Sequence, residues 1–120
     1  MKYMPAGKGE QVVKEDYRKR IIFPPADFDE EGHLLQVVTI PPNTRQRIHF
    51  HYKQTEVFYI LEGETLITIN GVEYLAKPGD SFICAPGDVH SLWNQTVREF
   101  RLVVFKINLP EDEEDSHWVE

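Results

Sequence analysis

The chain has 120 residues, of which 41% are hydrophobic and 12% aromatic, which is enough for one domain with a modest core. Its formal net charge is −7, and residues 111–120 contain acidic side chains but no Lys or Arg, so we expect no nucleic-acid partner. No apolar run approaches the roughly 18 residues that span a bilayer, residues 1–10 are polar, and there is one cysteine. We therefore expect a cytoplasmic protein with no membrane segment and no internal disulfide.

Composition divides the chain into an N-terminal arm at residues 1–20, a β-barrel domain at 21–110 and an acidic C-terminal tail at 111–120. Residues 8–20 are highly charged and are compatible with a loose arm, a short helix or an edge strand. The tail carries consecutive acidic residues and is expected to be solvated and mobile.

Short β-type segments separated by turn residues fill the middle of the chain. The segments predicted as strands are 21–23, 34–40, 45–52, 57–61, 65–69, 72–75, 81–85 and 100–107. Asn70-Gly71 is a strong hairpin signal, because both residues tolerate the positive φ that a type I′ turn requires. Strands at a spacing of about ten residues, without a convincing long helix, indicate an antiparallel sandwich or barrel.

A histidine pair is the most informative feature of this pattern. His49 and His51 alternate along a predicted strand, so their side chains point to the same face, about 6.6 Å apart at a rise of about 3.3 Å per residue. Glu56 has the wrong parity for the same strand, but residues 52–55 leave room for a turn that brings it back on the next one. His90 follows a Pro-Gly turn some way along the chain. Three imidazoles and a carboxylate can hold a divalent transition metal.

The spacing of these residues resembles the two-part signature of the cupin superfamily. The first part reads Asn43-x5-His49-x-His51-x4-Glu56-x6-Gly63, and the second reads Gly79-x7-Gly87-x2-His90-x3-Asn94. The resemblance implies an all-β jelly-roll barrel, also called a double-stranded β-helix. It also implies that the metal ligands are His49, His51, Glu56 and His90.

The chain departs from that signature at two turn positions. Asn43 stands where a glycine is usual, and the proline of the second part falls one place late, at Pro86, with Ala85 in the usual position. Asn and a shifted Pro can both serve in turns, so the four predicted ligands are unaffected.

The ligand set bears on the choice of metal. Zn²⁺ is usually tetrahedral, so four protein ligands would saturate it, whereas an ion that prefers six positions keeps two open for a ligand. Mixed imidazole and carboxylate ligation suits several ions, and affinity alone does not choose among them. We favour Fe or Mn, with Ni, Co and Zn as alternatives.

Two arginines precede the histidine pair. In a regular strand, Arg45 and Arg47 would share the face of His49 and His51. Arg47 could then hold a carboxylate or phosphate of a small-molecule substrate through a forked pair of hydrogen bonds. The alternative is an arginine at the rim, paired with an acidic residue of the 27–31 loop or of a dimer partner. Cys84 and Asn94 are expected to have structural roles, as a buried filler and a turn or strand-pairing residue.

These residues support two classes of function. The first is a metal-dependent enzyme that acts on a small oxygen-rich anionic molecule by dioxygenase or by isomerase or lyase chemistry, with Arg47 holding a remote anionic group. The alternative is a non-catalytic, metal-containing cupin that binds or senses a sugar or small acid; a metal-free sugar-nucleotide epimerase is disfavoured by the complete ligand set. We also predict a homodimer, because residues 8–23 could pair across an interface and cover an edge strand.

Overall fold

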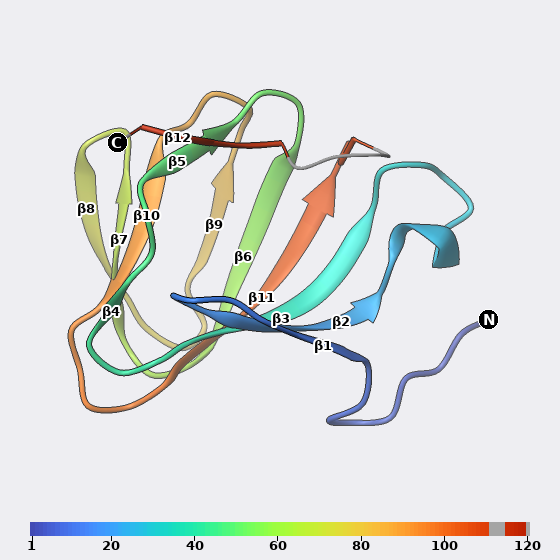
Figure 1. The fold of residues 1–120 in the computed structure, drawn as a ribbon, viewed down its shortest axis with the longest axis horizontal. Coiled ribbons are helices and arrows are strands. Elements are labelled where there is room, and N and C mark those ends of the chain that lie inside the picture. The colour runs from blue at the N-terminus through green and yellow to red at the C-terminus, as the bar shows by residue number, and fades with distance from the viewer. Residues whose placement is uncertain (111–114, 120) are drawn as a thin grey trace.

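The computed structural model describes residues 1–110 and 115–119, which form two antiparallel sheets that face each other (Figure 1). The first sheet contains, in spatial order, β1 (Glu10–Val13), β2 (Arg18–Phe23), β3 (Leu34–Ile40), β11 (Phe100–Ile107), β6 (Thr55–Glu62) and β9 (Ser81–Cys84). The second contains β12 (Ser116–Trp118), β5 (His49–His51), β10 (His90–Asn94), β7 (Thr65–Ile69) and β8 (Val72–Ala76), with β4 (Thr44–Arg45) also paired to β10. The predicted all-β jelly-roll fold is confirmed.

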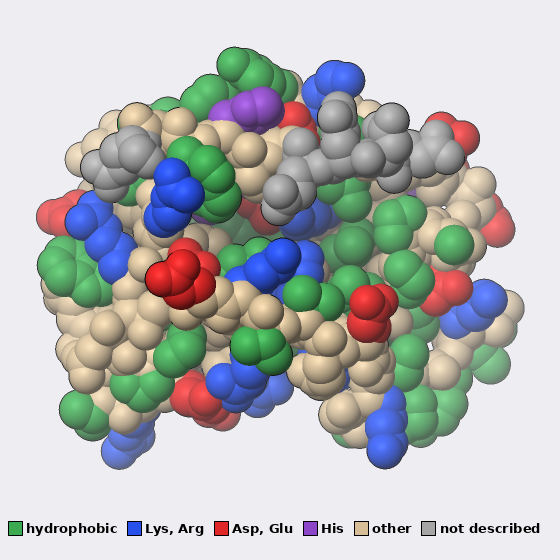
Figure 2. All heavy atoms as spheres, viewed as in Figure 1, with side chains coloured by type: hydrophobic (Ala, Val, Ile, Leu, Met, Phe, Trp, Pro, Cys, Tyr) green, Lys and Arg blue, Asp and Glu red, His purple; other side chains and the backbone are tan. Residues whose placement is uncertain are grey.

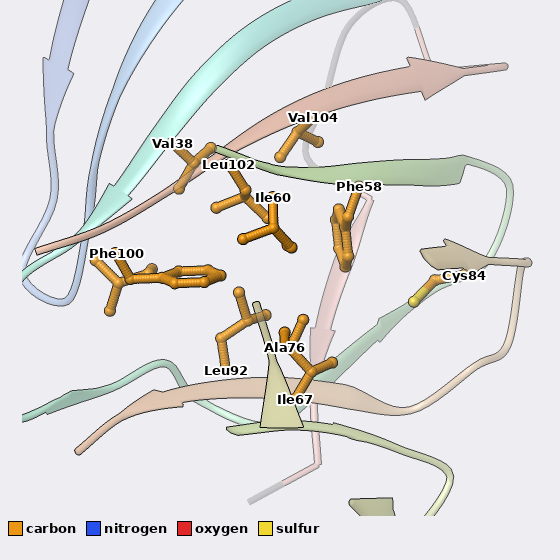
Figure 3. Close-up of a cluster of buried hydrophobic side chains, with 11 residues drawn as sticks. Val38, Phe58, Ile60, Ile67, Ala76, Cys84, Leu92, Phe100, Leu102 and Val104 are labelled. Atoms are coloured by element: carbon orange, nitrogen blue, oxygen red, sulfur yellow. The ribbon is translucent and has the colours of Figure 1, made fainter. Parts of the chain in front are cut away.

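Alternating hydrophobic side chains place the core between the two sheets. Along β11, Phe100, Leu102 and Val104 point inward on every second residue, as the period of a strand requires. They meet side chains such as Ile67 and Leu92 from the opposite sheet (Figure 3). Apolar packing fills this part of the barrel interior, so the polar residues that share it stand out.

The turn between β7 and β8 has the backbone conformation that its residues favour. Asn70 (φ 50°) and Gly71 (φ 82°) join β7 to β8, which confirms the predicted hairpin. The only helical segment in the described ranges is the short 3-10 helix η1 (Pro25–Asp27), and nothing there has the length of a membrane-spanning helix.

The N-terminal arm resolves into the edge-strand alternative. β1 pairs with β2, and β2 pairs with β3, so β1 is the edge strand of the first sheet. The single strand expected over 45–52 is instead broken, since β4 ends at Arg45 and β5 begins at His49. Between them the backbone N–H of Gln46 donates to the carbonyl of Leu92 at 2.8 Å. The regular alternation used to place Arg47 beside the histidines therefore does not hold.

The acidic tail requires a correction. Residues 111–114 and 120 lie outside the described part of the chain, but Ser116–Trp118 forms β12, which pairs antiparallel with β5. Asp115 is buried, and its carboxylate accepts hydrogen bonds from backbone N–H groups of the barrel, which compensate for its loss of water. The expectation of a solvated tail is wrong for this segment.

Candidate metal centre

Four buried side chains from three strands of the barrel converge at one point. His49 and His51 lie on β5, Glu56 is the second residue of β6, and His90 is the first residue of β10. Their ligand atoms all lie within 4.8 Å of one another. The register explains part of this, because His90 pairs directly with His49 across β10 and β5. The break after His51 lets Glu56 return from the other sheet, so the structure brings together all four residues that the sequence singled out.

Glu56 lies at the centre of the cluster. Its Oε1 atom is 2.8 Å from Nε2 of His51 and 3.1 Å from Nε2 of His90. Burial raises the pKa of this carboxyl, but the hydrogen bonds from the two histidines and the charge of Lys106 outweigh it. The pKa of Glu56 is therefore held well below its usual range, and the group is a carboxylate, the form that ligates metals.

The far side of each imidazole is fixed by a backbone carbonyl. Nδ1 of His49 lies 2.8 Å from the carbonyl oxygen of Arg47, and Nδ1 of His90 lies 2.8 Å from that of Asp88. The contacts between histidine Nε2 and Glu56 require a proton on Nε2, whose place a bound metal ion would take. Because a carbonyl can only accept, Nδ1 carries the other proton, and Nε2 would then offer its lone pair to the ion. This is the tautomer in which a histidine ligates a metal through Nε2 while its other nitrogen is held by an outer partner. Burial, together with the neighbouring His90, lowers the pKa of His49 to about 4.

His51 is held by two groups. Its Nδ1 atom lies 3.0 Å from the carbonyl oxygen of Asp115 and 2.6 Å from the side-chain amide of Gln54, both of them buried. Nδ1 can either donate a hydrogen bond to the Asp115 carbonyl or accept one from Nε2 of Gln54, and the first arrangement is the one in which Nε2 of His51 would ligate a metal. Three imidazole nitrogens and one carboxylate in a buried site are a donor set that fits a divalent transition ion.

The C-terminal segment orders the loop between His51 and Glu56. The carboxylate of Asp115 accepts hydrogen bonds from the backbone N–H groups of Tyr52 at 3.3 Å, Lys53 at 2.7 Å and Gln54 at 3.0 Å. Burial raises the pKa of Asp115, but these three donors outweigh it and lower the pKa overall. A loop with satisfied backbone groups keeps both flanking ligands in place. The sequence did not indicate this role of Asp115, because consecutive acidic residues are more typical of solvated tails.

Arg47 does not line the pocket that contains the cluster. Its side chain is exposed, and its guanidinium stacks over the ring of Trp118 with 4.3 Å between Cζ and the ring centroid. Trp118 in turn lies 5.5 Å from the His49 ring, centroid to centroid, and lines the pocket that holds the cluster. A role for Arg47 in substrate binding stays a prediction, and Arg47 would have to contact the substrate from the rim of the pocket.

The pocket at the cluster has a volume of about 70 Å³ and contains polar residues that sequence reasoning missed. Among them are Gln36 on β3, Gln46, and Lys106 near the end of β11. Lys106 continues the inward-facing register of Phe100, Leu102 and Val104, and Gln36 continues that of Val38 and Ile40. A polar residue in the inward register of an otherwise apolar strand was the available signal.

Comparison with known proteins gives the family. The family model described as a cupin domain matches residues 36–106, more than half of the chain. The protein belongs to the cupin family. This agrees with the resemblance carried by the two signature motifs, and the matched span contains all four residues of the cluster.

Named relatives differ in what they do. The chain is 30% identical to an oxalate-binding protein of Thermotoga maritima over 84% of this chain and 80% of that one. It is 29% identical to quercetin 2,3-dioxygenase of Bacillus subtilis over 73% of this chain but only 26% of the dioxygenase. This chain spans 66% of the length of another curated relative. The polyketide cyclase RemF of Streptomyces resistomycificus has the same fold, with a TM-score of 0.82 at 20% identity over 100% of this chain and 86% of that one.

Proposed function

We propose that this cupin is a divalent-metal-dependent enzyme that acts on a small oxygen-rich anionic molecule, by dioxygenase or by isomerase or lyase chemistry. The observation that carries the proposal is the convergence of His49, His51, Glu56 and His90 within 4.8 Å in a buried site. An Nδ1 atom bonded to a backbone carbonyl, as in His49 and His90, points the ligating nitrogen inward.

The protein groups around the cluster suit such a substrate. A bound divalent ion would supply Lewis-acid polarisation of a carbonyl, hydroxyl or carboxylate oxygen. Lys106 supplies a positive charge beside Glu56, and Phe58 and Leu102 supply an apolar wall that excludes water. The relative named quercetin 2,3-dioxygenase supports oxygenase chemistry on this scaffold, and we favour Fe or Mn as the ion.

A second candidate is a non-catalytic protein that binds a small acid at the same metal site. It is supported by the relative named oxalate-binding protein, which this chain matches over most of both lengths. Both candidates use the same four ligands, and they differ in whether product forms.

Elemental analysis of the purified protein, followed by turnover assays with the metal restored, tests both candidates. Substrate-dependent oxygen consumption supports a dioxygenase, and product without oxygen consumption supports an isomerase or lyase. Saturable binding without product supports the binding protein. The variant His51→Ala should lose stoichiometric metal while its circular dichroism remains that of a β-barrel. The matched variant His33→Ala, which removes a histidine packed between Phe28 and Phe105 outside the cluster, should keep its metal. Unchanged metal content in His51→Ala would overturn the proposal.

A further inference from the structure

The pocket beside the metal cluster has a charge opposite to that of the whole chain. The sequence carries a formal charge of −7, and acidic and basic side chains are interspersed over the face shown in Figure 2. The pocket, by contrast, is lined by two lysines, Lys19 and Lys106, and by one acidic residue, Glu56. A divalent ion at the cluster would add two further positive charges. The low-dielectric walls strengthen this field, so the pocket attracts anions.

We propose that this pocket binds a 2-hydroxy acid of two or three carbons, with Lys106 as the counter-ion of its carboxylate and with Gln36 as the acceptor of its hydroxyl hydrogen. The proposal rests on the proposed function, since the same ligand would lie against the metal. It differs from the sequence-based prediction, which assigned the anionic group to Arg47.

Lys106 is placed to meet a carboxylate next to the metal ligands. It pairs in register with Glu56 across β11 and β6, and its Nζ atom lies 4.0 Å from Oε2 of Glu56. Its side chain is only 16% exposed. An ammonium group has three donor hydrogens, and no other ion pair of Lys106 is found among the described residues, so the group retains donors for a ligand.

Two glutamines have unpaired amide oxygens at the pocket, and Gln36, the more deeply buried of them, is the acceptor assigned to the single hydroxyl hydrogen. Gln36 is 3% exposed, and its Oε1 atom is buried without a hydrogen-bond partner in the described part of the chain. The Oε1 atom of Gln46 is in the same situation, and both residues line the pocket. Buried polar atoms in native proteins are nearly always paired, so unpaired amide oxygens at a ligand pocket indicate that the ligand supplies the donor. A hydroxyl group is such a donor, whereas a simple carboxylate offers none.

The size of the pocket limits the rest of the molecule. The volume of the pocket is about 70 Å³. A cavity that holds a benzene ring in a protein core measures roughly 150 Å³. An aromatic substituent would therefore not fit within the pocket, and a short aliphatic acid would. Glycolate and lactate have the required carboxylate, hydroxyl and size.

Isothermal titration calorimetry on the metal-loaded protein tests this assignment. Glycolate or lactate should bind saturably. Acetate, which lacks the hydroxyl, and mandelate, which adds a phenyl ring to the same hydroxy acid, should bind at least tenfold more weakly. Lys106→Met should weaken glycolate binding tenfold or more without changing the metal content, and Lys106→Arg should recover part of the affinity. Gln36→Leu should reduce the preference for glycolate over acetate. The control Lys77→Met removes an exposed lysine outside the pocket and should bind as the wild type does.

The outcomes separate this proposal from the proposed function. The hydroxy-acid assignment would be overturned if the metal-loaded protein bound neither glycolate nor lactate. It would also be overturned if the Lys106→Met variant bound them as tightly as the wild type does. Mandelate binding as tightly as lactate would also overturn it. Absence of metal from the wild-type protein would overturn the proposed function instead. In that case, glycolate titration of the metal-free wild type and of metal-free Lys106→Met would still test whether Lys106 binds the carboxylate.

Discussion

The carboxylate of Asp115 holds the backbone nitrogen of Lys53 at 2.7 Å across 62 residues of chain. The same carboxylate accepts the N–H groups of Tyr52 and Gln54, and the carbonyl of Asp115 lies 3.0 Å from Nδ1 of His51. One residue therefore joins the C-terminal segment to the loop that separates two of the four candidate ligands. The stability of that loop and its capacity to hold a metal should depend on it.

The substitution Asp115→Asn tests this dependence. An amide retains one acceptor but loses the charge, so we expect the free energy of unfolding to fall by about 1–3 kcal/mol. Metal affinity should fall several-fold because the His51–Glu56 loop loosens. Urea denaturation and metal titration measure the two effects. Asp80→Asn is the matched control, since the Asp80 carboxylate accepts the N–H of Lys77 at 3.0 Å in a distant turn. It should lose stability while keeping metal affinity, and an equal loss of affinity in both variants would contradict the role of Asp115.

Gly63, between β6 and β7, should tolerate no side chain. It has a φ of 80°, and an added Cβ would lie 2.5 Å from the carbonyl oxygen of Glu99. Gly79 has a similar φ of 93°, but an added Cβ there would meet nothing within 4 Å. Gly79→Ala should cost about 1–2 kcal/mol through the backbone alone. Gly63→Ala should cost a further 1–3 kcal/mol, roughly, because of the clash. Thermal unfolding of the two variants measures the difference, and equal losses would show that the Glu99 backbone moves aside freely.

The strands and ligands could be predicted where local residues decide them. The predicted bounds 34–40, 65–69 and 100–107 match β3, β7 and β11, because alternating apolar residues end at clear turn residues. The cluster of His49, His51, Glu56 and His90 was accessible through side-chain spacing within a recognisable motif.

The remaining features depend on partners that local sequence does not indicate. The break between Arg45 and His49 is fixed by a backbone hydrogen bond from Gln46 to Leu92 in another strand, so the parity of Arg47 could not be read correctly. Asp115 lies in an acidic run, and its partners are backbone N–H groups. Every residue except proline has such a group, so no side chain in the sequence indicates the contact. Lys106 was missed although its parity with Val104 placed it inside the barrel.

Metal removal should lower the stability of the whole barrel. An ion that binds only the folded protein stabilises it by about 2.7 kcal/mol when its free concentration is 100 times Kd. For a domain of this size that corresponds to a rise in Tm of roughly 10 °C. Differential scanning calorimetry with Mn²⁺ and then with EDTA measures the shift. The variant Glu56→Gln, which lacks the carboxylate at the centre of the cluster, should show little response to the ion. A wild-type Tm that does not move between Mn²⁺ and EDTA would contradict a metal site at the cluster.

The metal-free protein should lose stability in mildly acidic solution, in part through His49. Burial, followed by repulsion from His90, lowers the pKa of His49 from 6.5 to about 4. Between these two values the unfolded chain binds a proton at this residue that the folded protein does not. The free energy of unfolding therefore decreases as the pH falls from 6.5 towards 4, by up to about 1.4 kcal/mol per pH unit for this one group.

The variant His49→Gln isolates that contribution. Glutamine does not titrate, so urea unfolding of the metal-free variant should show a shallower dependence of unfolding free energy on pH in this window. Both proteins are measured in excess EDTA, so that release of a metal does not add to the slope. Above pH 6.5 the two curves should run parallel, because His49 is neutral in both the folded and the unfolded wild-type chain. Equal slopes between pH 4 and 6.5 would show that the imidazole of His49 takes up its proton without unfolding the barrel, and that the cluster is more open to water than its burial indicates.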